Sequence, residues 1–117
     1  MIGPGIHLMV DGITEMSFTA RYLQQFLLDV VGMVGMQVIM GPFVHGQRST
    51  WDGWVVLAES HAAIHIQGEA CHVDLFSCQR FAVDVALGFI EYRLKLSHRN
   101  VEVIERIMPR VIHDRET

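Results

Sequence analysis

The strongest constraint on the fold is the way helical and strand-like hydrophobic patterns alternate along the chain. Apolar residues recur at helical spacing over residues 17–34, and a second amphipathic segment covers residues 80–96. The segments expected to be strands are 5–10, 36–40, 53–58, 61–67, 72–77 and 101–107. This pattern predicts an α+β fold, a two-layer sandwich with two helices on one face of a mostly antiparallel sheet, in the general order β-α-β-β-β-α-β. The other face of the sheet then needs a cover, which a second copy of the chain could provide.

Local signals refine these expectations. Ser17 is the expected N-cap of the first helix, and Gly35 is its expected stop. Residues 41–53 are rich in Gly, Pro, Ser, Thr and Asp, which predicts a loop, and loops of that length often carry function. The strand at 53–58 lacks polar alternation, which predicts burial on both faces. The expected apolar side of the second helix carries Phe81, Val85, Phe89 and Tyr92.

Length and composition limit the classes of protein to consider. The 117 residues are expected to form a single domain over residues 1–117. Half of them are hydrophobic and 19% are charged, so we expect the excess apolar surface to form a homo-oligomer interface, most simply a dimer. The net charge of −4 argues against nucleic acid and anionic membrane surfaces as partners. With no transmembrane-length apolar run, no signal-peptide pattern and only two Cys, a cytoplasmic protein with free thiols is expected.

Chemically capable side chains are densest between residues 59 and 78. Ser60 follows Glu59 and an apolar strand, and a Ser in that place is either a turn residue or a nucleophile that needs activation. The chain lacks the G-x-S-x-G pattern of a hydrolase elbow. Cys78 lies at an expected strand-to-helix junction, where a helix N-terminus would activate a thiol. Cys71 is better explained as a small buried apolar residue.

The histidines of this segment do not form a metal-binding motif. His61 and His65 are four residues apart, and on a strand they would lie roughly 13 Å apart at the usual rise. That separation is too large for one ion, and neither C-x-x-C nor H-E-x-x-H occurs. The sequence therefore predicts no metal site. Trp51 and Trp54, shortly before Ser60, are either core residues or a platform for a ligand.

Several segments together resemble the short prokaryotic class of S-adenosylmethionine decarboxylase. The similar residues are 5–11 (GIHLMVD), 53–61 (GWVVLAESH), Ile64-His65, Glu69 and 73–78 (VDLFSC). The resemblance extends over nearly the whole chain in the order of its elements. It implies a proenzyme that cuts itself between Glu59 and Ser60, so that Ser60 becomes a pyruvoyl group. Such a group forms a Schiff base with the substrate amine and accepts electrons when carbon dioxide leaves.

The resemblance also implies roles for other residues. His65 would assist the β-elimination that completes cleavage, and Cys78 would return a proton to the α-carbon of the substrate. Glu69 would hold the ribose hydroxyls, with position 67 next to the substrate. The product would serve spermidine synthesis.

The chain departs from the family pattern near this site. Asp52 stands where the family usually has Ser, and Gln67 where it often has Trp. Trp51 or Phe43 would then supply the aromatic surface near the substrate. Two alternatives therefore remain: a pyruvoyl-dependent arginine or ornithine decarboxylase on the same scaffold, and an unprocessed binding or regulatory homologue.

Overall fold

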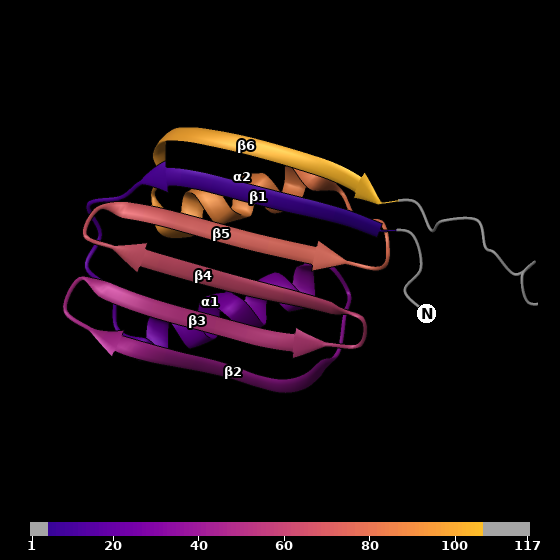
Figure 1. Ribbon diagram of the computed structural model, residues 1–117, viewed down its shortest axis with the longest axis horizontal. Coiled ribbons are helices and arrows are strands. Elements are labelled where there is room, and N and C mark those ends of the chain that lie inside the picture. The colour runs from indigo at the N-terminus through magenta and orange to yellow at the C-terminus, as the bar shows by residue number, and fades with distance from the viewer. Residues whose placement is uncertain (1–4, 107–117) are drawn as a thin grey trace, which may run out of the picture.

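Residues 5–106, which the computed structural model describes, form a six-stranded sheet with two helices on one face (Figure 1). The elements are β1 (Gly5–Ile13), α1 (Ala20–Met33), β2 (Val38–Gln47), β3 (Thr50–Leu57), β4 (Ser60–Gln67), β5 (Ala70–Ser77), α2 (Val83–Leu94) and β6 (Ser97–Arg106). The α+β sandwich predicted from the sequence is confirmed. Each of the six predicted strand segments corresponds to one strand, so four strands lie between the helices, where the general order above writes three.

The strand order in the sheet is β2-β3-β4-β5-β1-β6, and every pairing is antiparallel. The first strand, β1, therefore lies between two strands from the second half of the chain. In Figure 1 both helices lie behind the sheet, α1 behind β3 and β4 and α2 behind β1. Within residues 5–106, no helix is both long enough and apolar enough to cross a membrane.

The predicted loop over residues 41–53 is wrong. Most of this segment belongs to β2 and β3, which are joined by a short turn at Arg48 and Ser49. Its Gly and Pro residues are compatible with a strand because β2 is an edge strand of the sheet. The pairing with β3 shifts between Met40 and Phe43, on either side of Gly41 and Pro42. Proline is tolerated at such edges and irregularities, where no ladder hydrogen bond is lost.

Helix α1 begins later than the sequence suggested. Thr19 is the N-cap, and its side chain accepts a hydrogen bond from the Tyr22 backbone N–H at 3.1 Å. The predicted cap at Ser17 is therefore wrong, because a second hydroxyl residue two positions later makes the capping contact. Gly35 is confirmed as a stop: its φ of 73° is in the left-handed region that glycine adopts easily.

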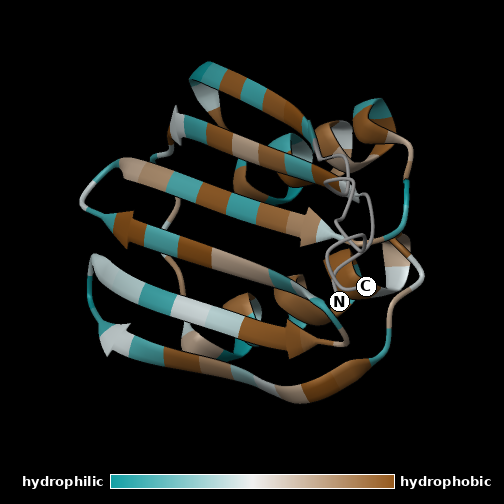
Figure 2. Cartoon of the chain, turned by 45° about the vertical axis from the view of Figure 1, so that its right-hand side comes forward, coloured by the Kyte–Doolittle hydropathy of each residue, from teal (hydrophilic) through white to brown (hydrophobic). Residues whose placement is uncertain are grey.

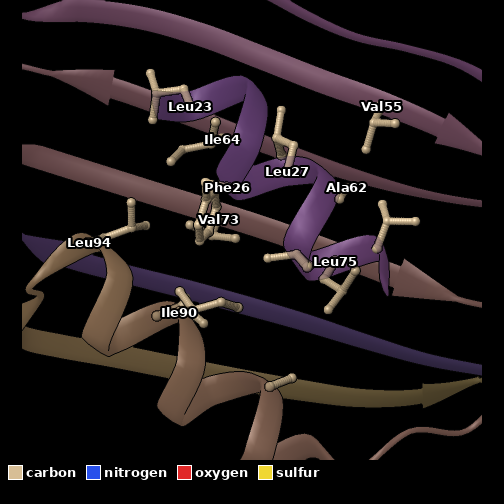
Figure 3. Close-up of a cluster of buried hydrophobic side chains, with 14 of the residues drawn as sticks. Leu23, Phe26, Leu27, Val55, Ala62, Ile64, Val73, Leu75, Ile90 and Leu94 are labelled. Atoms are coloured by element: carbon tan, nitrogen blue, oxygen red, sulfur yellow. The ribbon is translucent and has the colours of Figure 1, made fainter. Parts of the chain in front are cut away.

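The core lies between the helices and the sheet (Figure 3). The largest fully buried side chains are Phe26, Leu8, Leu23, Leu27, Ile64, Leu75, Ile90, Leu94, Val10, Val30, Val55 and Val73. Helix α2 packs through Ala86, Ile90 and Leu94, which recur every four residues. The predicted packing side is wrong in part, because Val85 and Tyr92 are exposed.

The sheet face away from the helices has no cover in the described chain, and we call it the open face. Hydrophobic and hydrophilic residues alternate along its strands (Figure 2). In β3, Val55 and Leu57 are buried whereas Trp54 and Val56 are exposed. Burial of this strand on both faces was therefore wrong for a single chain. Because β3 carries apolar residues at Trp54 and Val56 as well, these side chains form apolar surface on the open face.

Candidate functional site

Ser60 is the first residue of β4 and follows the tight turn that links β3 to β4. Leu57 pairs with Ser60 across this hairpin, so the turn consists of Ala58 and Glu59. Glu59 has a φ of 59°, in the left-handed region that is unfavourable for a residue with a side chain. Such conformations cost about 1–3 kcal/mol and cluster at functional sites. The backbone just before Ser60 is therefore strained.

The Ser60 hydroxyl is held by the segment that follows β5. Its oxygen accepts a hydrogen bond from the backbone N–H of Cys78 at 2.8 Å, and Ser60 is 6% exposed. The Cys78 thiol donates to the carbonyl oxygen of Ala58 at 3.8 Å. Cys78 thus contacts the residues on both sides of Glu59. We call this region, with Glu59, Ser60 and Cys78, the Ser60 end of the sheet.

The position of Cys78 differs from the expected one in one respect. Helix α2 begins at Val83, not near residue 80, so Cys78 lies before the first turn of the helix. The sequence argument that a helix N-terminus acts on this thiol therefore does not hold. Its contacts are with the turn at Glu59 instead.

Three polar side chains converge on the open face at the same end. His7 and His61 both pair in register with Phe76, and Asp74 lies two residues before Phe76 on the same face. The Nε2 atom of His7 hydrogen-bonds to Oδ1 of Asp74, and Nε2 of His61 lies 3.7 Å from that oxygen. We call His7, His61 and Asp74 the His-Asp cluster. Sequence reasoning missed it, although the alternation of His72, Asp74 and Phe76 along β5 indicates one shared face.

His65 lies toward the other end of β4. It is five residues from Ser60, so the two residues point to opposite faces and are roughly 16 Å apart at the usual strand rise. The Nδ1 atom of His65 lies 2.7 Å from Oδ1 of Asp52 on β3. Its ring stacks against that of His72 with 6.2 Å between ring centres. One chain therefore does not bring His65 to Ser60.

A pocket of about 450 Å³ opens around His65. Its lining residues are Asp11, Gly12, Thr50, Asp52, His65, Ile66, Gln67, Ala70, Cys71 and His72. It contains two imidazole–carboxylate pairs, because His72 Nδ1 also lies 2.8 Å from Oδ1 of Asp11. The two carboxylates in this lining offer acceptors to a cationic ligand. We call this region the His65 end.

The residues expected next to the substrate differ in accessibility. Gln67 lines the pocket, and Glu69 is exposed in the turn between β4 and β5. Trp51 is 8% exposed and packs in the core, and its indole N–H donates to the carbonyl of Arg48 at 2.9 Å. This packing argues against a ligand platform at Trp51.

The exposed aromatic surface lies elsewhere on the open face. Trp54 is 43% exposed, and its ring lies 5.7 Å from that of Phe43 on β2. Of the two aromatic residues proposed from the sequence to replace the family's Trp, Phe43 is thus the accessible one. Trp54 provides a second accessible ring beside it.

Cys71 differs sharply from Cys78. It is 3% exposed, and burial, with a smaller effect from Asp11, raises the pKa of its thiol to about 12. The prediction that Cys71 is a buried apolar residue is confirmed.

These features fit one class, an α+β sandwich with a Glu-Ser turn beside a cysteine. A family model described as S-adenosylmethionine decarboxylase matches residues 7–107. The chain belongs to the S-adenosylmethionine decarboxylase family.

The fold is shared with a solved member of this group. The crystal structure of the adenosylmethionine decarboxylase from Aquifex aeolicus VF5 is similar, with a TM-score of 0.73. The match covers 94% of this chain and 96% of that chain, at 18% sequence identity. At that identity the likeness shows the fold alone. No curated protein sequence matches this chain significantly.

Proposed function

We propose that the chain is a self-cleaving decarboxylase of S-adenosylmethionine whose pyruvoyl group derives from Ser60. Its product would be the aminopropyl donor for spermidine synthesis. The observation that carries the proposal is the strained Glu59 backbone directly before a fixed Ser60 hydroxyl. Family membership supports the choice of substrate.

The residues at the Ser60 end suit the formation of such a group. In this proposal the Ser60 oxygen adds to the carbonyl carbon of Glu59, and the peptide C–N bond breaks to give an ester and a free amine. β-Elimination then expels the Glu59 carboxylate, and water releases ammonia to leave a ketone at residue 60. The left-handed backbone at Glu59 favours the step because breaking the bond relieves its strain.

The same residues suit the decarboxylation that follows. A pyruvoyl group supplies an electron sink for the bond to the departing carboxylate. Cys78 is proposed to return the proton to the substrate carbon, because its thiol contacts Ala58 and its backbone contacts Ser60. Both contacts hold Cys78 beside the proposed cleavage point.

The proposed role of His65 requires a second copy of the chain. Within one chain His65 and Ser60 are roughly 16 Å apart along β4. A two-fold pairing of open faces with opposed strand directions would bring the Ser60 end of one copy over the His65 end of the other. It would place His65 of the second copy near the Glu59 turn, whereas the Ser60 hydroxyl itself faces the helices. The open face offers apolar contacts for such a pairing, because Phe43, Trp54 and Val56 are exposed on it. Glu69 and Gln67 would then reach the substrate from the second copy.

Mass spectrometry of the denatured protein tests the cleavage. Wild-type protein is expected to separate into chains 1–59 and 60–117, the second blocked by a pyruvoyl group. Ser60→Ala should remain one chain. The matched control is Ser77→Ala, because Ser77 is a buried serine at the same end whose oxygen accepts from the Gln79 N–H at 3.0 Å. An intact wild-type chain after long incubation would contradict the proposal and favour the unprocessed binding homologue.

A basic amino acid is the second candidate substrate. Gln67 replaces the Trp that the family often has at this position. The carboxylates of Asp11 and Asp52 line the pocket and offer acceptors to a cation. Carbon dioxide release from S-adenosylmethionine, arginine and ornithine separates the candidates. Release from arginine or ornithine without release from S-adenosylmethionine would overturn our first choice.

Glu69 gives a sharper test of the substrate. Hydrogen bonds to a charged group contribute about 1.5–3 kcal/mol. If Glu69 accepts from the ribose diol, Glu69→Gln should raise KM for S-adenosylmethionine by roughly one to two powers of ten. Cleavage at Ser60 and any turnover of arginine or ornithine should not change, because those amino acids carry no diol.

A further inference from the structure

We propose that the His-Asp cluster is a binding site for one divalent transition-metal ion, with Zn²⁺ as the reference ion. The site would use Nε2 of His7, Nε2 of His61 and a carboxylate oxygen of Asp74. It lies on the open face, whereas the Ser60 side chain is buried on the opposite side of β4. The observations behind this site are therefore separate from those that support cleavage at Ser60.

The three ligand atoms already converge. They all lie within 4.8 Å of one another, and His61 Nε2 is 3.7 Å from Asp74 Oδ1. Ligands at 2.0–2.1 Å from a tetrahedral ion are roughly 3.4 Å apart, so this pair needs little movement. His7 Nε2 is hydrogen-bonded to the same oxygen, and the ion would replace that shared proton.

The surroundings orient the ligands as neighbouring groups do in metal sites. The second carboxylate oxygen of Asp74 lies 3.9 Å from Nε2 of His72, whose Nδ1 is 2.8 Å from Asp11. The buried ring of Phe76 packs against both cluster imidazoles, with centre-to-centre distances of 5.8 Å to His7 and 5.9 Å to His61. Outer partners of this kind fix ring and carboxylate orientation and strengthen metal binding.

The donor set identifies the class of ion. Two imidazoles and one carboxylate favour zinc, iron, cobalt or nickel over magnesium and calcium, which prefer oxygen ligands. The side chains of His7, His61 and Asp74 are 25%, 48% and 26% exposed. In a single chain, three protein ligands with this accessibility would leave coordination positions for water or a small anion, as in open metal sites.

The competing explanation is a His7–Asp74 hydrogen bond with His61 nearby and no metal affinity. Calorimetric titration of untagged, metal-stripped protein with Zn²⁺ separates the two. We expect one equivalent per chain at micromolar affinity or tighter. Co²⁺ should give the visible absorption of a low-symmetry site and should be displaced by Zn²⁺.

Variants locate the site. His61→Gln and Asp74→Asn should each weaken Zn²⁺ binding at least 100-fold, and His72→Gln should weaken it about 10–100-fold. The matched control is His98→Asn, which removes an exposed histidine of β6 and places Asn at a φ of 50° that it tolerates. This control should bind as wild type does.

Two results would overturn the proposal. One is the absence of saturable Zn²⁺ binding to the wild-type protein. The other is unchanged affinity in His61→Gln, which we expect to fold because the His61 side chain is 48% exposed. Far-UV circular dichroism of each variant shows whether a loss of binding reflects a loss of fold.

Discussion

The two cysteines lie in different surroundings. Cys78 lies against the Glu59 turn, whereas Cys71 is enclosed in the core. We expect Cys78→Ala to leave cleavage at Ser60 intact, because a proton donor acts only after decarboxylation. Turnover should fall by roughly 10²–10⁴-fold, the usual contribution of general acid catalysis.

The control for this prediction is Cys71→Ala, which should lose only some stability. Both variants are compared by mass spectrometry for cleavage and by carbon dioxide release for turnover. Equal turnover in the two variants would show that the thiol of Cys78 is not the donor.

The raised pKa of Cys71 gives a prediction for alkaline pH. The folded thiol has a pKa of about 12 against a usual value of 9.0. The unfolded chain therefore releases this proton first, so the Cys71 contribution lowers stability as pH rises from about 9 toward 12. Urea unfolding at pH 8 and pH 10 should show a smaller loss in Cys71→Ala than in wild type. An identical loss in both would show that Cys71 is not responsible.

At the scale of elements, the β2–β3 hairpin depends on a close approach that only glycine allows. Gly46 has a φ of 148°, and a Cβ there would lie 2.1 Å from the carbonyl oxygen of Thr50. Gly46→Ala should therefore lower the free energy of unfolding by more than about 1 kcal/mol. Thermal unfolding of the variant measures the effect.

Helix α2 contains a glycine in the opposite situation, where a Cβ has room. Gly88 is in its interior, and a Cβ there meets nothing within 4 Å. Gly88→Ala should raise the free energy of unfolding by about 0.5–1 kcal/mol, the usual gain of alanine over glycine in a helix. A loss of stability in Gly88→Ala would contradict this prediction.

The sequence patterns predicted the helices and strands better than they predicted which strands pair with each other. The helical spacing of Phe26 and Val30 and the apolar runs of β4 and β5 predicted the two layers. The composition around Pro42 misled because an edge strand tolerates residues that an inner strand does not. The His-Asp cluster was not predictable from spacing, since it depends on β1 and β4 pairing with the same neighbour, β5.

The separation of Ser60 from His65 illustrates the same limit. Their odd spacing on a strand already places them on opposite faces. Nothing in one sequence, however, shows which other surface meets each face. For that reason the sequence provides candidate site residues but does not show which surface meets them.

At the scale of the whole molecule, the open face predicts association. We expect sedimentation to show a dimer at micromolar concentration. Trp54→Lys should weaken it by placing a charge on the exposed apolar surface. The control is Tyr92→Lys, because Tyr92 is 76% exposed on helix α2 and lies away from the open face. A stable wild-type monomer, or equal dissociation in both variants, would contradict this arrangement.

The strand order has a topological consequence for any cut at the β3–β4 hairpin. The part before the cut contains β1, β2 and β3, and the part after it contains β4, β5 and β6. Because β1 is inserted between β5 and β6, and β3 borders β4, three hydrogen-bonded seams join the two parts (Figure 1). Severing one bond would create two new chain ends without releasing a fragment. The two parts would sediment as one particle until a denaturant separates the paired strands at all three seams.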